Sequence, residues 1–341
     1  MLVARRVLQP LPSCLLAANR TMSSVGSANF KVDIQDDVAT VRMAKLPGNA
    51  LDLSFFQEFL DVFNEVENSC RGMILTSDLP QIYSAGLNIK AVAQLSSTTE
   101  VSEFLAGLEK FWFRIYSSKL ATVAAINGHA TAAGCSIALA CDYRIMSKGD
   151  KKPYTIGLNE PRLGLEIPFW LLEAYKDTIS NRNVDLHAQL GTLFPEEEAA
   201  KLGLVDQLVS KEELLPEAHK RMKEFLNVAD HSRQGCKLLL RRNLMNHYSQ
   251  VGDKERQRLA ETLTSPKTRE LIKEMIMKLS KSLDNNRGYM LYTVRQSRNK
   301  TDLLAGSVSY AVSFTKVESL TAVDINFHNT VANQLGGYDV L

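Results

Sequence analysis

Paired cysteines are missing from this sequence. No two of its five cysteines have Cys-x-x-Cys spacing, and its histidines form no cluster. A structural zinc site needs several such ligands at short spacings, and a disulfide framework needs many cysteines in a short chain. We therefore predict no metal site, and we expect free thiols in a reducing compartment. The cysteines are Cys14, Cys70, Cys135, Cys141 and Cys236.

A strong excess of charge is also absent. The 341 residues include 40 basic and 38 acidic side chains, so the net charge is only +2. General binding to nucleic acid needs a basic surface, because the phosphate backbone is recognised through charge. We therefore predict no nucleic-acid partner. With 45% hydrophobic and 23% charged residues, the chain has an ordinary globular composition and is long enough to bury a large core.

The first 29 residues contain no acidic residue. Arg5, Arg6 and Arg20 supply positive charge, serines are present, and the first carboxylate is Asp33. This composition is typical of a mitochondrial transit peptide, whereas a secretory signal would contain a longer unbroken apolar segment. We interpret residues 1–29 as a transit peptide that directs the protein to the mitochondrial matrix. A terminus that is merely disordered is the alternative.

Long uncharged segments are rare in this chain. One stretch of membrane-spanning length runs from residue 120 to residue 140. Asn127-Gly128-His129 lies in its middle and is a turn signal. We therefore predict a buried strand, a turn and a buried helix in this stretch, and no membrane span.

Short apolar segments alternate with amphipathic segments between residues 38 and 146, which predicts an α/β fold. A capping box from Ser54 to Gln57 is expected to begin the first helix. Residues 77–86 are expected to form a loop, and residues 127–133 a turn. The expected strands are 38–43, 72–76, 122–126 and 143–146, and the expected helices are 54–66, 101–116 and 134–140.

Beyond residue 168 the pattern is almost wholly helical. Pro195 and the run Glu196-Glu197-Glu198 suit a helix N-terminus, and we expect this acidic run to be solvated rather than catalytic. A last short strand is expected at 205–209. Long charged helices should follow at 211–227 and 232–282. From about residue 285 no clear period remains, so we interpret 285–341 as an extension outside the domain, with disorder as one interpretation.

Two loops of small residues occur at the starts of expected helices. The first contains Ala85, Gly86 and Leu87, and the second runs from residue 127 to residue 134. Backbone N–H groups at a helix start lack intrahelical partners, and small side chains let a ligand approach them closely. Two such loops can hold one anionic oxygen between two N–H donors, as an oxyanion hole does. Ordinary tight connections are the alternative interpretation.

A third segment, residues 156–164, contains one carboxylate, Glu160, directly before Pro161. A following proline biases the backbone of Glu160 toward an extended conformation. On this feature alone, a solvated surface carboxylate is the simpler interpretation.

Taken in this order, the three segments resemble the crotonase (enoyl-CoA hydratase/isomerase) superfamily over roughly residues 30–282. Within the third, Gly157-Leu158-Asn159-Glu160 is similar to the motif of the isomerase branch. Other segments that resemble this branch are 84–87 (SAGL), 125–128 (AING), 141–145 (CDYRI), 168–171 (PFWL) and 204–207 (LVDQ).

The resemblance implies a spiral of ββα turns over residues 30–200 and a helical region at 201–284 that assembles a homotrimer. It implies an acyl-CoA thioester as substrate and no cofactor, since CoA is part of that substrate. The backbone N–H groups of Leu87 and Ala133 would form the oxyanion hole, and Glu160 would be the catalytic carboxylate. The implied substrate-binding residues are Ala85, Gly86, Leu87, Asn88, Ile89, Ala133 and Asn159.

Position 136 separates the branches of the family. Hydratases that resemble this chain have a second glutamate there, because adding water is easier with two carboxylates, whereas this chain has Ser136. A single carboxylate suits an isomerase that removes a proton from C2 and returns it at C4. The resemblance therefore implies conversion of 3-enoyl-CoA, cis or trans, to trans-2-enoyl-CoA in β-oxidation of unsaturated fatty acids. The alternatives are hydration, or a non-catalytic protein that binds RNA or a partner.

Two positions depart from the family pattern. The family often has Asp where Asn88 stands, and it usually has Gly where Ala133 stands. A backbone N–H survives at position 133, but the methyl group narrows the approach to it.

Overall fold

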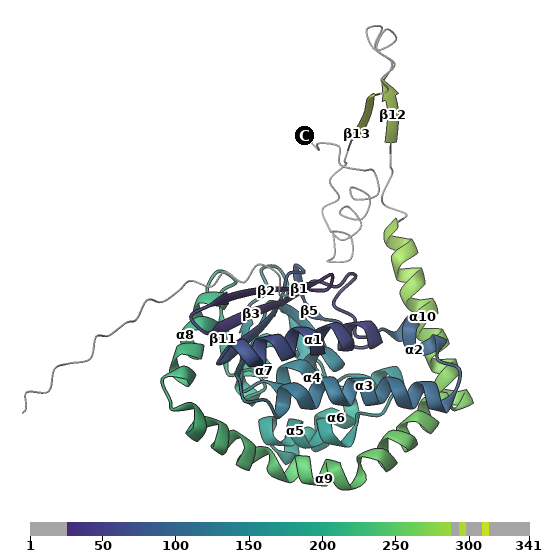
Figure 1. The fold of residues 1–341 in the computed structure, drawn as a ribbon. Coiled ribbons are helices and arrows are strands. Elements are labelled where there is room, and N and C mark those ends of the chain that lie inside the picture. The colour runs from purple at the N-terminus through teal and green to yellow at the C-terminus, as the bar shows by residue number, and fades with distance from the viewer. Residues whose placement is uncertain (1–25, 288–292, 298–308, 314–341) are drawn as a thin grey trace, which may run out of the picture.

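The computed structural model describes residues 26–287, 293–297 and 309–313. Most of the predicted transit peptide, including Cys14, and most of the C-terminal extension lie outside these residues. Figure 1 shows helices packed around two sheets, with a long curved helix, α9, running along one side of the molecule. Within the described residues, no helix has the length and apolarity that crossing a bilayer requires.

Two sheets form the centre of the fold. The larger has seven strands in the order β1-β2-β3-β4-β6-β8-β11, and the smaller has four in the order β10-β9-β7-β5. β1, β2 and β3 pair antiparallel, and β3 to β11 pair parallel. The strands are β1 Gly26–Ser27, β2 Phe30–Gln35, β3 Val38–Met43, β4 Gly72–Ser77, β5 Gln81–Ser84, β6 Ala121–Ile126, β7 Gly128–Thr131, β8 Tyr143–Ser147, β9 Thr155–Gly157, β10 Phe194–Pro195 and β11 Gln207–Val209.

Each turn of the chain places one strand in each sheet and then a helix. β4 is followed by β5 and α2, β6 by β7 and α4, and β8 by β9 and the short 3-10 helix η1. The predicted spiral of ββα turns is therefore confirmed. The helices are α1 Leu53–Ser69, α2 Ile89–Gln94, α3 Thr98–Tyr116, α4 Ala133–Ala140, η1 Glu160–Leu163, α5 Phe169–Ile179, α6 Asn181–Leu190, α7 Glu196–Leu202, α8 Leu214–Leu226, α9 Asp230–Thr264 and α10 Pro266–Arg287.

Aromatic side chains fill the space between the larger sheet, α1 and α3. Phe55, Phe59 and Phe63 follow helical spacing on α1 and are fully buried. Phe59 lies edge-on to Phe111 of α3, with ring centroids 4.7 Å apart. Side chains of this size dominate the free energy gained from burial, and edge-to-face pairs add to it. The phenylalanine stripe is therefore core.

The C-terminal helices pack back onto the spiral. α8 covers one face of the larger sheet through a separate apolar cluster that includes Ala218 and Met222. α9 is held to the core by Asp142, whose carboxylate lies 2.9 Å from Lys237 Nζ and 2.9 Å from Arg241 Nη2. Since Asp142 is also bonded by the N–H and hydroxyl of Thr122, this buried charge is well satisfied.

Six strands of the two larger sheets were missed by sequence reasoning: β1, β2, β5, β7, β9 and β10. Two of them lie inside segments that were expected to be irregular. β5 lies within the expected loop 77–86, and β7 lies within the expected turn 127–133. Both strands have only four residues, so they are too short to show a clear alternation. Gly128 is needed there because a Cβ would lie 1.9 Å from the Gln81 carbonyl carbon.

Several expected helix boundaries were wrong. The predicted Ser54–Gln57 capping box is absent, because Asp52 caps α1 by accepting from the Phe55 N–H at 3.1 Å. α3 begins at Thr98, three residues before Val101, with a capping box from Ser97 to Glu100. The single expected helix 232–282 is divided, since α9 ends before Pro266 and α10 follows.

The acidic run of α7 is only partly solvated. Glu197 and Glu198 are exposed as expected, but Glu196 is 4% exposed and accepts the Gly149 N–H at 3.2 Å. The prediction of a wholly solvated run was therefore wrong at Glu196, because the loop after β8 folds over it.

The extension from residue 285 contains some regular structure. α10 continues to Arg287, and strands β12 (Thr293–Ser297) and β13 (Ser309–Ser313) pair antiparallel with each other. Neither strand joins the two larger sheets.

Candidate active site

The three segments singled out in the sequence meet at one edge of the smaller sheet. β5, β7 and β9 are parallel neighbours, so their carboxyl ends lie at the same edge. Residues 85–88 follow β5, Ala132 and Ala133 follow β7, and Asn159 and Glu160 follow β9. Parallel neighbours commonly build a site from the loops at this edge. The topology thus brings together residues that lie up to 75 positions apart, counting from Ala85 to Glu160.

The first loop leaves one backbone N–H free. Leu87 forms a parallel bridge with Leu51, in which Leu51 N–H donates to Gly86 O at 2.9 Å and Asn88 N–H donates to Leu51 O at 2.8 Å. These two bonds fix the peptides on either side of Leu87. Within the described part of the chain, the Leu87 N–H itself donates to no protein acceptor.

The second loop presents the N–H of Ala133 at the start of α4. Ala132 has φ 51° and ψ −125°, a backbone conformation that residues other than glycine rarely adopt. Its N–H donates to Gly157 O at 2.9 Å. Such strain persists only where the surroundings impose it, and it concentrates at functional sites. As the first helical residue, Ala133 has no intrahelical acceptor for its N–H, and the described residues supply no other.

The two loops are in direct contact. A Cβ at Gly86 would lie 2.9 Å from Thr131 O and 3.2 Å from Ala133 N. At Gly134, a Cβ would lie 2.2 Å from Ser84 O. Only glycine permits these approaches, so the two free N–H groups belong to one small region of backbone. This geometry suits two donors that share one oxygen.

Glu160 is buried, whereas its sequence context alone had favoured a solvated surface carboxylate. It is the first residue of η1, it is 7% exposed, and its Oε2 has no hydrogen-bond partner within the described chain. Loss of solvation raises the pKa of Glu160 from its usual 4.5 to about 7, although its own backbone N–H opposes the shift. A carboxylate with this pKa can both take up and release a proton near neutral pH.

Two other buried polar groups lie near Glu160, and one of them, Tyr175, was not anticipated. The hydroxyl of Tyr175, on α5, and the Oδ1 of Asn159 also have no hydrogen-bond partner among residues 26–287. Burial raises the pKa of Tyr175, and the neighbouring Cys135 and Glu160 raise it further. Tyr175 lies in an apolar helix where its spacing indicates only core, so the sequence held no signal for it.

Asn88 has a structural task at the end of the first loop. Its side chain caps α2 by accepting the Ala91 N–H at 3.2 Å, and its amide donates to Asp52 Oδ2 at 3.2 Å. An aspartate could still cap α2 but could not donate to Asp52. The departure from the family pattern is therefore matched by a local partner. The remaining loop residues differ in exposure: Ala85 is exposed, and Ile89 packs against the core.

Ser136 is enclosed within α4. It is fully buried, and its hydroxyl donates to Ala133 O at 2.7 Å. Its own carbonyl accepts from Trp112 Nε1 at 2.8 Å. Its side chain is thus occupied within its own helix.

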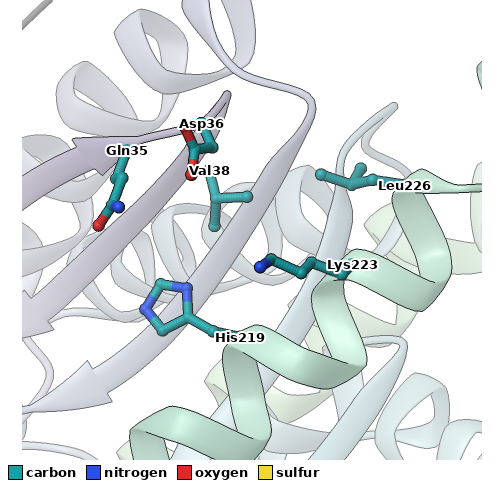
Figure 2. Close-up of a pocket in the computed structure, with 6 residues that line it drawn as sticks. All are labelled: Gln35, Asp36, Val38, His219, Lys223 and Leu226. Atoms are coloured by element: carbon teal, nitrogen blue, oxygen red, sulfur yellow. The ribbon is translucent and has the colours of Figure 1, made fainter. Parts of the chain in front are cut away.

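A separate cavity of about 260 Å³ lies between the β2–β3 turn and α8, as Figure 2 shows. Val38, on its wall, belongs to the apolar cluster under α8, whereas Ala133 and Cys135 belong to the cluster on the other side of the sheet. None of the predicted site residues lines this cavity. Its lining residues are Gln35, Asp36, Val38, His219, Lys223 and Leu226.

Comparison with known proteins shows the family of this chain. Residues 33–284 match the enoyl-CoA hydratase/isomerase family, which is well over half of the chain. The chain belongs to this family. The membership applies to the spiral and to α8, α9 and most of α10.

Among members of the family, similar proteins carry the name mitochondrial enoyl-CoA delta isomerase 1. The protein from Rattus norvegicus is 39% identical over 245 residues, covering 70% of this chain and 84% of that protein. The one from Homo sapiens is 39% identical over 207 residues, covering 60% and 68%. The crystal structure of human mitochondrial delta3-delta2-enoyl-CoA isomerase superposes with a TM-score of 0.72 at 32% identity, covering 74% of this chain and 99% of that one.

Solved hydratases share the fold at lower identity. The enoyl-CoA hydratase from Bacillus halodurans has a TM-score of 0.66 at 23% identity, covering 72% of this chain and 100% of that one.

The similarity to the rat and human isomerases confirms the predicted resemblance to the isomerase branch. It also confirms the prediction of an enzyme homologous to those isomerases.

Proposed function

We propose that this protein moves the double bond of 3-enoyl-CoA, cis or trans, to give trans-2-enoyl-CoA in the β-oxidation of unsaturated fatty acids. The observation that carries the proposal is one buried carboxylate, Glu160, with a pKa of about 7 and an Oε2 that no described residue bonds. It lies at the same sheet edge as two unpaired backbone donors, and no second carboxylate stands at position 136.

The reaction needs one group that moves a proton between two carbons. Ionised Glu160 removes a proton from C2, and the electron pair spreads through the C3–C4 double bond and the thioester carbonyl. The oxygen becomes enolate-like and accepts hydrogen bonds from the N–H groups of Leu87 and Ala133. Protonated Glu160 then delivers the proton to C4, which leaves the double bond between C2 and C3. The substrate-binding roles proposed for Ala85, Gly86, Asn88, Ile89 and Asn159 follow from their places in the two loops and beside Glu160.

This scheme uses no cofactor, because CoA enters as part of the substrate. Hydration would ask for a second group to orient and activate water. Ser136 is a poor candidate for that role, since it is buried and its hydroxyl is bonded within α4. These features favour isomerisation over hydration.

The test is an assay of the purified protein with 3-enoyl-CoA and with trans-2-enoyl-CoA, side by side. Formation of trans-2-enoyl-CoA from the first, with little water addition to the second, is the expected result. Faster hydration of trans-2-enoyl-CoA than isomerisation of 3-enoyl-CoA would assign the protein to the hydratase reaction. Inactivity on both, with a salt-dependent shift of RNA mobility, would favour the non-catalytic alternative.

We further propose a homotrimer in the mitochondrial matrix. The names of the similar proteins from rat and human place them in mitochondria. Within the described residues, α9 exposes Leu239 and Leu240 by 60% and 81%, and contiguous exposed apolar surface commonly marks an interface. Light scattering of the purified protein should give three times the mass of one chain, and a monomer at micromolar concentration would contradict the assembly.

A further inference from the structure

Helix α10 contacts both halves of the candidate site. Its first turns pack against α2, which begins directly after the Leu87 loop, and against η1, which begins with Glu160. In Figure 1, α10 stands beside α2 at one end of the molecule. Thr268 and Ile272 are 6% and 1% exposed, so this part of α10 is anchored in the fold. α10 contains none of the segments that the sequence motifs singled out.

Arg269 makes the contact with α2. Its Nη1 donates to Val92 O and Ala93 O, each at 3.3 Å, and its Nη2 donates to Leu95 O. The last carbonyl oxygens of a helix have no intrahelical donor, so a guanidinium satisfies them and complements their partial negative charge. Arg269 has no ion-pair partner among the described residues, and its donors are directed at this helix end.

Leu271 makes the contact with η1. Gly164 ends η1 in a left-handed conformation, with φ 72°. A Cβ at Gly164 would lie 2.5 Å from Leu271 Cδ1, so the leucine occupies the space that a larger residue would need. η1 is a single turn, and Leu165 N–H also donates back to Glu160 O at 3.0 Å. A shift of Gly164 would therefore be transmitted to Glu160.

We infer that the first turns of α10 fix the position of the Leu87 loop (residues 85–88) relative to the Glu160 carboxylate, with Arg269 and Leu271 as positioning residues. The inference rests on the proposed function, because only the isomerase reaction makes this relative position important. The structural part of the inference rests on the contacts of α10. Neither residue touches the reacting atoms. Their effect is on the distance between the Leu87 N–H and the Glu160 carboxylate. A misplacement of about 1 Å can cost on the order of 100-fold in rate, so such a clamp has a measurable consequence.

The first experiment compares Arg269→Ala, Arg269→Lys and Lys273→Ala. Lys273 is one turn further along α10 and exposed, so its loss removes a cation without touching α2 or η1. We expect Arg269→Ala to lower kcat by about 10- to 100-fold with KM changed less than about threefold. Arg269→Lys should recover part of the loss, because an ammonium can still donate to these carbonyl oxygens. Lys273→Ala should behave as wild type.

Two kinetic outcomes would overturn the inference. Wild-type kcat in Arg269→Ala would show that the contact with α2 does not set the geometry. A raised KM with unchanged kcat would show that Arg269 holds the substrate, for example a CoA phosphate, and does not align the machinery. Leu271→Ala tests the contact with η1 in the same way. It should also lower kcat with little change in KM.

Hydrogen exchange separates failure of this inference from failure of the proposed function. The amides of residues 89–95 should exchange faster in Arg269→Ala than in wild type, and those of 162–165 faster in Leu271→Ala. This readout does not depend on isomerase activity. Unchanged exchange in both segments, in folded protein, would contradict the clamp. Faster exchange in the variants, together with a wild-type protein that lacks isomerase activity, would leave the clamp standing and remove the proposed reaction.

Discussion

At the scale of single residues, the environment of Glu160 decides the chemistry. A carboxylate on the surface keeps a low pKa and is a weak base, whereas burial raises the pKa of Glu160 to about 7. In the part of the chain that the structure describes, Oε2 has no hydrogen-bond partner, which leaves it available to a substrate. The proposed reaction therefore needs both the carboxylate of Glu160 and its enclosure.

Replacement of Glu160 tests this directly. Glu160→Gln keeps the size of the side chain but cannot accept a proton, so turnover should fall by at least about 100-fold. Substrate binding should change little, because it depends on the loops and the acyl pocket. Ser136→Ala is the matched control, since Ser136 is buried nearby but moves no proton, and it should retain most of the activity. Steady-state kinetics would measure both, and an inactive Ser136→Ala beside an active Glu160→Gln would overturn the assignment.

The raised pKa of Glu160 also predicts a pH dependence of stability. Below about pH 4.5 this residue is protonated in the folded and the unfolded chain. Between 4.5 and about 7 only the unfolded chain loses the proton, so the free energy of unfolding falls as pH rises. The whole loss is about 3 kcal/mol, since one pKa unit corresponds to about 1.4 kcal/mol.

Glu160→Gln should remove this loss. Urea unfolding should show the variant more stable than wild type at pH 8, by up to about 3 kcal/mol, with the difference vanishing toward pH 4.5. Glu198→Gln replaces an exposed carboxylate and should match wild type at both pH values. Equal stability of Glu160→Gln and wild type across this range would mean that Glu160 is not desolvated. Burying this base thus costs stability in exchange for function.

At the scale of elements, the small sheet and α10 do most to shape the site. β5, β7 and β9 deliver the loops to one edge, and α10 ties the ends of α2 and η1. β12 and β13, in contrast, pair only with each other among the described strands. We therefore expect the elements needed for activity to end with α10.

Truncation after Arg287 should leave fold and activity close to wild type. The expected boundary near residue 285 moves to 287, because α10 continues to that residue. The change removes no strand of the two larger sheets and no part of α10. Thermal unfolding and the isomerase assay would measure the outcome. A truncated protein that lost assembly or activity would place the extension within the functional unit.

At the scale of the whole molecule, the structure narrows the expected position of transit-peptide cleavage. β1, at Gly26 and Ser27, pairs with β2, and Asn29 Nδ2 donates to Glu58 Oε1 at 2.6 Å. A transit peptide cleaved at residue 29 would remove β1, so processing should occur at or before residue 25. The N-terminus of protein isolated from cells would decide this, because a mature chain that still begins at Met1 would exclude cleavage.

The sequence by itself determined the parts and their order. Three segments together carry the family resemblance, and that resemblance implies two donor loops and one carboxylate. The apolar periods predicted five of the seven strands of the larger sheet and most of the helices. These are local properties, since they depend on residue type and spacing along a few turns of chain.

Only the tertiary structure decided how those parts act together. The four-residue strands β5 and β7 carry too little pattern to be seen, yet their pairing brings Leu87 and Ala133 into one region. The pKa of Glu160 depends on what surrounds it from distant parts of the chain, and neither Tyr175 nor Arg269 belongs to any of the motifs. Burial, proximity and the loss of solvent are properties of packing between elements, and no local pattern encodes them.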